Sequence, residues 1–292
     1  MTEDHRVGLI GVGLLGTAMA QRFVAAGRDV LGFDVDASRR DALQGLGGTP
    51  TTSPAEVIEQ RDIIFLSLPT SDIAREVLEA VSNSFRPGQV IVDTTTGDPQ
   101  TMASLGKWMA EQKVDYLDAT IAGSSRQAAE GQVVGMVGGP ESALKRCEFL
   151  LNDFCKQVFH LGEWGAGARM KLVLNLVLGL NRAVLAEGLS FAEALGMDAS
   201  RALEVLRASV AYSGVMDTKG PKMIQRDFSV EARLAQHHKD VRLMLAAAAK
   251  AGAKLPLSQV HEQLLATLAT TGLADVDNSA IIEAFRTSPT KK

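Results

Sequence analysis

The sequence has few of the features that mark secreted or nucleic-acid-binding proteins. Only two cysteines, Cys147 and Cys155, occur in 292 residues, which argues against a disulfide framework and favours a reducing compartment. The 30 basic residues are outnumbered by 34 acidic residues, and the net charge of −4 excludes the basic excess of a nucleic-acid-binding domain. These absences predict a cytoplasmic protein without a nucleic-acid partner.

Long apolar runs and metal-binding patterns are also absent from the sequence. The best candidate for a membrane span, residues 172–185, is interrupted by Asn175, Asn181 and Arg182, whereas a span needs about 18 apolar residues. Residues 1–6 are polar, which argues against a signal peptide. No histidine has metal-ligand spacing with cysteine or acidic residues. We therefore expect neither a membrane partner nor a bound metal.

Short apolar runs alternate with helical patterns through the first half of the chain. Strand-like runs lie at residues 7–10, 30–33, 63–68, 90–92, 116–117, 133–137 and 158–160. Helical patterns lie between them at residues 15–26, 55–60, 73–81, 101–112 and 141–150. This alternation predicts an α/β fold with a doubly wound parallel sheet covered on both faces.

The pattern becomes almost wholly helical after Gly162. Residues 165–196 contain no proline, and a helix of about 30 residues would be about 45 Å long. Apolar residues occupy most of its circumference, so we expect it to be buried in an all-α domain and to form an oligomer contact. Further helices are expected at residues 200–209, 232–252, 257–271 and 278–286. The predicted domains are residues 1–163 and 164–292.

A glycine-rich motif follows the first predicted strand. Gly11, Gly13 and Gly16 form a G-x-G-x-x-G pattern that opens a helix, the context of a Rossmann dinucleotide site. Asp34 ends the second strand, where a carboxylate accepts hydrogen bonds from the adenosine ribose and repels the 2′-phosphate of NADP. Val35 stands where a phosphate site would favour arginine, although Arg39 and Arg40 are nearby. The motif therefore predicts NAD, with NADP less favoured.

Two polar residues interrupt the apolar segment of the long helix. Lys171 and Asn175 are four residues apart and share one helix face. A buried lysine is costly unless it has a partner or a function. Periodicity alone allows either a functional pair or a lysine that reaches the surface.

With these motifs the chain resembles the β-hydroxyacid dehydrogenase family, which includes 3-hydroxyisobutyrate dehydrogenase. The resemblance covers nearly the whole chain and rests on residues 11–27, 67–69 with 93–99, 118–139, 162–175 and 239–241. It implies a reversible, NAD-dependent oxidation of the hydroxyl group of a small β-hydroxy acid. It also implies a homodimer or homotetramer.

The resemblance assigns roles to individual residues. Lys171 would be the general acid and base, and Asn175 would bind the substrate hydroxyl or carboxylate. The cofactor would be bound by Gly11, Gly13, Leu14, Leu15, Gly16, Asp34, Leu68, Pro69, Thr96 and Lys239. The substrate would be bound by Ala122, Gly123, Ser124 and Asn175, with backbone N–H groups around Gly123 and Ser124 holding its carboxylate.

The substrate motif departs from the family pattern. Thr120, Ala122 and Ser124 replace the usual proline, serine and second glycine, and the run from Gly123 is closer to glyoxylate/succinic semialdehyde reductases, which typically use NADPH. Such a reductase and an imine reductase are the alternative enzymes, although imine reductases typically lack a lysine at position 171. A non-catalytic NAD(P)-binding scaffold is the alternative outside enzymes.

Overall fold

The computed structural model describes residues 5–286 and divides into two compact units, Met1–Lys171 and Leu172–Lys292. The predicted domain boundary, between residues 163 and 164, lies slightly earlier in the chain. The division falls later because the first turn of helix α8 (Ala166–Ala194) is hydrogen-bonded to a strand of the first unit.

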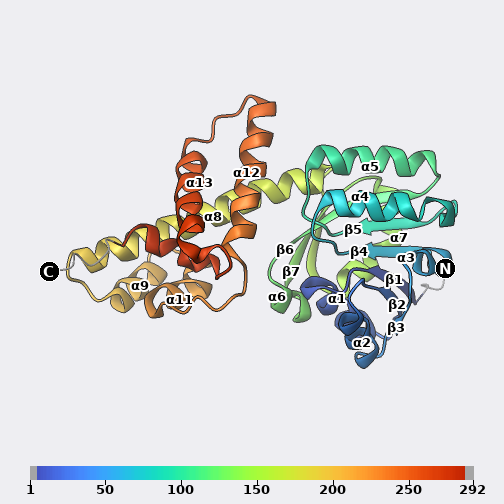
Figure 1. The fold of residues 1–292 in the computed structure, drawn as a ribbon, viewed down its shortest axis with the longest axis horizontal. Coiled ribbons are helices and arrows are strands. Elements are labelled where there is room, and N and C mark those ends of the chain that lie inside the picture. The colour runs from blue at the N-terminus through green and yellow to red at the C-terminus, as the bar shows by residue number, and fades with distance from the viewer. Residues whose placement is uncertain (1–4, 287–292) are drawn as a thin grey trace. The chain divides into compact units, whose positions relative to one another are not determined.

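The first unit is built on an eight-stranded sheet with the strand order β3-β2-β1-β4-β5-β6-β7-β8 (Figure 1). The strands are β1 (Arg6–Ile10), β2 (Asp29–Phe33), β3 (Thr49–Pro50), β4 (Ile63–Leu66), β5 (Val90–Asp93), β6 (Asp115–Ala122), β7 (Val133–Gly138) and β8 (Cys155–His160). All neighbouring strands are parallel except β6 and β7. The predicted doubly wound parallel sheet is confirmed, and its one antiparallel pair is β6 with β7, because the link between these two strands is too short for a parallel crossover.

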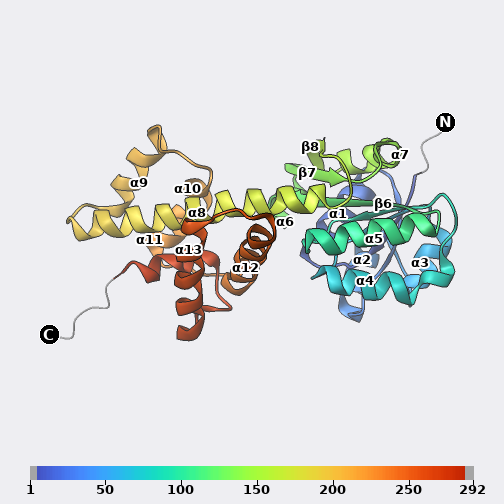
Figure 2. The same cartoon turned by 90° about the horizontal axis from the view of Figure 1, so that it is seen from above.

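Helices cover both faces of this sheet. They are α1 (Leu14–Ala25), α2 (Ala37–Gly45), α3 (Pro54–Gln60), α4 (Ser71–Ala80), η1 (Ser82–Ser84), α5 (Pro99–Glu111), α6 (Ser125–Ala129) and α7 (Glu141–Asn152). One core cluster joins Phe23 of α1 and Leu150 of α7 to Phe65. A second cluster joins Leu78 of α4 and Met102 of α5 to the other face. Figure 2 shows α7 on the side of the sheet opposite to α4 and α5.

The second unit is all-helical, as predicted. Beyond α8 it contains α9 (Ala199–Ala208), α10 (Val215–Thr218), α11 (Gly220–Gln225), α12 (Leu234–Ala251), α13 (Pro256–Leu268), η2 (Ala269–Leu273) and η3 (Asn278–Ala284). Its core includes Leu189, Leu203, Val241, Leu265 and Ile281. Figure 1 shows α12 and α13 side by side, and the two helices pack together. The helix expected over residues 257–271 ends as an α-helix at Leu268 and continues into η2, where Gly272 has a φ of +86°.

Helix α8 is only partly buried within the chain, which corrects the expectation of burial on all sides. Leu172 and Leu189 are buried, whereas Val184 and Phe191 are 66% and 63% exposed. By length and composition alone α8 could also cross a membrane, since its most apolar window has a mean hydropathy of 1.5; 44% of that window is buried within the protein. Asn175, Asn181 and Arg182 interrupt the apolar run of this helix, but its mean hydropathy stays high. Core helices of soluble proteins meet the same criteria of length and hydropathy, so this one helix is weak evidence for a membrane span.

Candidate active site

The turn between β1 and α1 has a backbone that requires glycine at two positions. Gly11 has a φ of +94°, and a Cβ added there would lie 2.2 Å from the carbonyl oxygen of Ser67. A Cβ on Gly16 would lie 2.0 Å from the carbonyl oxygen of Gly11. Gly13 is the N-cap of α1 and supplies no side chain, while Leu14 is exposed at the start of the helix. The turn therefore presents a helix N-terminus, with its backbone N–H groups, to a pyrophosphate.

Asp34 ties this turn to the end of β2. Its Oδ2 accepts a hydrogen bond from the backbone nitrogen of Val12 at 2.7 Å, and its Oδ1 accepts one from Asp36 at 3.0 Å. The Arg40 guanidinium donates to the carbonyl oxygen of Asp34 at 2.6 Å. Arg39 lies across the turn, with its Nη1 2.9 Å from the position that a Cβ on Gly13 would occupy. A carboxylate and two guanidinium groups thus share the adenosine end of the predicted site.

The loops that follow β4 and β5 are tied to each other. The backbone nitrogen of Leu68 donates to the hydroxyl of Thr95 at 3.3 Å, and the Thr94 hydroxyl donates to the carbonyl oxygen of Leu66 at 2.7 Å. Thr96, like Leu68, is half-buried, whereas Pro69 is exposed. Because these strands are parallel to β1, their loops lie at the same edge of the sheet as the glycine turn.

Strand β6 extends beyond β5 at this edge. Asp118 is its last residue paired with β5, and four more residues carry the strand about 13 Å further to Ala122. Gly123 has a φ of +142°, and Ser124 caps α6. The backbone nitrogen of Ser124 donates to Oε1 of Gln127 at 2.9 Å, so this N–H group is already engaged by the protein. That engagement weakens the expectation that Ser124 supplies a backbone donor to a substrate carboxylate.

The Lys171 amine lies at the end of β6. Its Nζ donates a hydrogen bond to the carbonyl oxygen of Ile121 at 2.5 Å, and the side chain is half-buried. Ile121 directly precedes the predicted substrate residues Ala122 and Gly123. The structure therefore brings the predicted proton-transfer group and part of the predicted substrate loop together within the first unit.

Asn175 and Lys239 lie in the second unit. The Asn175 side chain is buried, and its Nδ2 donates to Oδ2 of the buried Asp240 at 3.2 Å. Lys239 is half-buried on α12 and lines a hollow of about 430 Å³ together with His238 and Arg242. Sequence reasoning missed Asp240 as the hydrogen-bond partner of Asn175. Its position directly after Lys239, within the family stretch 239–241, was a signal that could have identified it.

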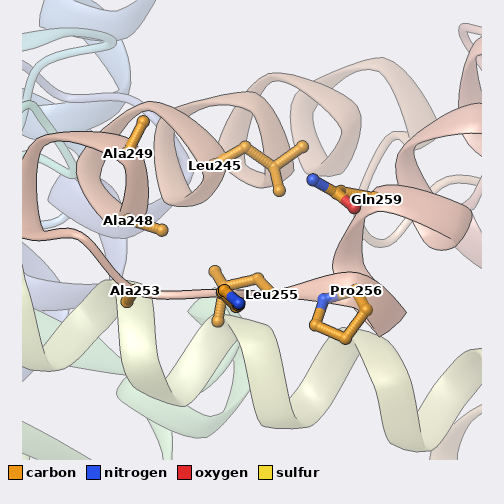
Figure 3. A pocket seen from close by; sticks show the side chains of 8 residues that line it. Leu245, Ala248, Ala249, Ala253, Leu255, Pro256 and Gln259 are labelled. Carbon is orange, nitrogen blue, oxygen red and sulfur yellow. The ribbon is translucent and has the colours of Figure 1, made fainter.

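A separate apolar hollow lies between α12 and α13. Figure 3 shows Leu245, Ala248, Leu255 and Pro256 around it, with the Gln259 amide at one side. Its volume is about 390 Å³, and none of the predicted site residues lines it. The polar residues that line the hollow are Lys254 and Gln259, and neither is among the predicted site residues.

Within residues 5–286, no group of three His, Cys, Asp or Glu side chains is placed to hold a metal ion.

Comparison with known proteins gives matches over almost the whole chain. Residues 6–162 match the family described as the NAD binding domain of 6-phosphogluconate dehydrogenase. Residues 165–285 match the family described as NAD-binding of NADP-dependent 3-hydroxyisobutyrate dehydrogenase.

Three individual proteins illustrate the similarity. The chain is 31% identical to 2-(hydroxymethyl)glutarate dehydrogenase of Eubacterium barkeri, over 98% of this chain and 96% of that protein. It is 30% identical to the chloroplastic glyoxylate/succinic semialdehyde reductase 2 of Arabidopsis thaliana, over 98% of this chain and 81% of that protein. The structure of Mycobacterium tuberculosis 3-hydroxyisobutyrate dehydrogenase with L-serine superposes with a TM-score of 0.89 at 27% identity, covering 97% of this chain and 99% of that one.

Proposed function

Because the chain belongs to the β-hydroxyacid dehydrogenase family and is an NAD(P)-dependent oxidoreductase acting on CH–OH groups, we propose that Lys171 transfers the proton of the reaction. The supporting observation is the hydrogen bond that holds its Nζ at the carbonyl of Ile121. In oxidation the amine would accept the hydroxyl proton, and in reduction it would protonate the developing alkoxide. A neutral amine keeps two N–H donors, so the bond to Ile121 can persist in both protonation states.

We propose NAD as the preferred cofactor, which when bound supplies the hydride acceptor. Support comes from Asp34, whose carboxylate beside Val12 would repel a 2′-phosphate. A carboxylate has about four acceptor positions, so its two backbone bonds leave capacity for ribose hydroxyls. Arg39 and Arg40 would favour the opposite preference, but Arg40 is already engaged by the carbonyl oxygens of Asp34 and Val35.

We propose a small β-hydroxy acid as substrate, held by its anionic group near Ala122 and Gly123. Asn175 would contribute the oxygen of its amide to the substrate hydroxyl, since its Nδ2 donates to Asp240. The relatives act on substituted glutarates or semialdehydes, and L-serine accompanies the similar solved structure. A panel of three- to six-carbon hydroxy acids and semialdehydes, with L-serine among them, covers this range.

The Lys171→Ala variant tests the proposal with whichever substrate of the panel the wild type turns over. Loss of acid–base catalysis should lower kcat by about 10²- to 10⁴-fold while the Kd of the cofactor stays within twofold. Lys145→Ala is a matched control, because Lys145 is an exposed lysine of the same unit that pairs with Glu141. Turnover by Lys171→Ala within tenfold of wild type would remove Lys171 from this role. No turnover of any compound by the wild type would favour the scaffold alternative.

A further inference from the structure

A buried carboxylate of β6 binds the start of α8. The side chain of Asp118 has no exposed surface, and its Oδ1 accepts a hydrogen bond from the backbone nitrogen of Gly165 at 2.8 Å. Its Oδ2 accepts one from the backbone nitrogen of Ala168, also at 2.8 Å. Both donors belong to the N-terminal end of α8, where N–H groups have no partner within the helix and the helix dipole favours a negative charge.

Glycines allow this close approach between strand and helix. A Cβ on Gly167 would lie 2.3 Å from the carbonyl oxygen of Asp118 and 2.4 Å from that of Met136. A Cβ on Gly138 would lie 2.4 Å from Oδ1 of Asp118. The glycines at positions 138 and 167 are therefore required for the carboxylate to reach the helix.

Two further hydrogen bonds, from the Thr120 hydroxyl and from the Lys171 amine, extend the contact between β6 and the start of α8. The Thr120 hydroxyl donates to the carbonyl oxygen of Gly167 at 2.9 Å, and Lys171 donates to the carbonyl of Ile121. These hydrogen bonds join Asp118, Thr120 and Ile121 of the strand to residues 167–171 of α8. The start of the helix is thus fixed against β6, with the carboxylate at one end of the contact and the amine at the other.

The carboxylate is retained at a cost to the fold. Burial raises the pKa of Asp118 to about 6, and the amide hydrogen bonds only partly oppose this effect. A buried carboxylate is costly, and an uncharged serine, threonine or asparagine caps helices well in most proteins. A charged group with two strong bonds holds the helix start more rigidly than one neutral cap would.

We propose that Asp118 is a positioning residue that sets the height and rotation of the first turn of α8 and so places the Lys171 amine at the end of β6. This inference rests on the proposed role of Lys171. Weakening the two hydrogen bonds that Asp118 accepts would allow the first turn of α8 to shift relative to β6. Misplacement of a catalytic group by about 1 Å can cost about 10²-fold in rate.

Asp118→Asn is the first test, because the amide keeps the shape but turns an NH₂ group towards a backbone N–H. We expect kcat to fall at least tenfold and the Kd of the cofactor to stay within twofold. The wild-type pH–kcat profile should contain a limb that is missing from the profile of Lys171→Ala. In Asp118→Asn this limb should move by one pH unit or more. Asp153→Asn is the matched control, since this carboxylate pairs with Arg28 at 2.9 and 3.2 Å at the C-terminal end of α7.

A second pair of variants keeps the test valid if Asp118→Asn does not fold. Thr120→Val removes the hydroxyl bond to Gly167, and Thr120→Ser restores it. We expect the valine variant to lose kcat at least threefold with the same shift of the pH limb, and the serine variant to recover both. Unchanged kcat and pH limb in the foldable variants would overturn the positioning role. If Lys171→Ala itself kept full turnover, the proposed function would fail separately.

Discussion

Asp34 brings a negative charge into the glycine turn. The side chain is 9% exposed and accepts hydrogen bonds from the backbone nitrogen of Val12 in the turn and from that of Asp36 after β2. It therefore does two things at once, because the carboxylate that would select the ribose also supports the backbone that would bind the pyrophosphate. A change at this residue should affect both the affinity for cofactor and the choice between cofactors.

The Asp34→Asn variant separates these two effects. Loss of the charge should weaken binding of both cofactors and lower the ratio of kcat/KM for NAD over NADP at least tenfold, since the repulsion of a 2′-phosphate disappears. Steady-state kinetics with each cofactor give the ratio. Asp36→Asn is the control, because that exposed carboxylate caps α2 through the nitrogen of Ser38. A wild-type enzyme that prefers NADP would contradict the proposed cofactor.

At the scale of elements, a buried ion pair holds the helices of the second unit together. Asp277 is fully buried, and its carboxylate accepts hydrogen bonds from the backbone nitrogens of Glu231, Ala232 and Ser279. The Nζ of Lys219 donates to both of its oxygens, at 2.9 and 3.0 Å. Burial raises the pKa of Asp277, but these hydrogen bonds outweigh it and bring the pKa down to about 2.

Asp277→Ala should lower the free energy of unfolding by about 3–5 kcal/mol, because Lys219 would keep a buried charge without its main partner. The depressed pKa means that the stabilisation is complete above pH 4 and is lost as the pH falls towards 2. The variant should therefore show a shallower loss of stability over that range. Urea unfolding followed by circular dichroism measures both effects. Glu204→Ala, which breaks an exposed pair with Arg201, should leave stability unchanged.

The sequence predicts elements best where their residues alone determine them. Buried parallel strands are nearly continuous apolar runs, and this is why most strands were located within a few residues. Strand β6 was expected only at residues 116–117, because Asp118 and Thr120 interrupt the run. Both are buried through partners on α8, which are about 50 residues away and leave no local pattern. The short β3, α6, α10 and α11 gave too few residues for a periodic signal.

The site shows the same division between local and distant information. The glycine turn and Asp34 could be found from spacing, because a short stretch of chain contains the whole motif. The bond from Lys171 to Ile121 and the bond from Asn175 to Asp240 join residues that are 50 and 65 positions apart. Lys171 and Asn175 could be singled out as candidate site residues from the sequence, but their hydrogen-bond partners could be identified only from the three-dimensional fold.

At the scale of the whole molecule, α8 exposes an apolar stripe. Val177, Val184 and Phe191 recur every seven residues, and each is more than half exposed in the single chain. An exposed stripe of this size indicates a contact with another protein surface. We propose that it lies in the interface of a homodimer or homotetramer.

Val184→Glu should shift the protein to the mass of a monomer, 31.0 kDa, because a buried charge in an apolar interface is costly. Size-exclusion chromatography with light scattering gives the mass directly. Leu257→Glu is the control, since Leu257 is 68% exposed on α13 and lies outside the stripe. A wild-type protein that is itself monomeric would show the proposal to be wrong.

The unbroken course of α8 has a consequence for protein engineering. The helix starts against β6 and runs for 29 residues, so Lys171 and Asn175 lie about one turn apart on one continuous helix. Each inserted or deleted residue turns everything downstream by about 100°. A chimera that joins this nucleotide-binding half to the helical half of a relative must therefore preserve the phase of the helix. A joint one residue out of step would send the two side chains in different directions, even with every residue of both halves intact.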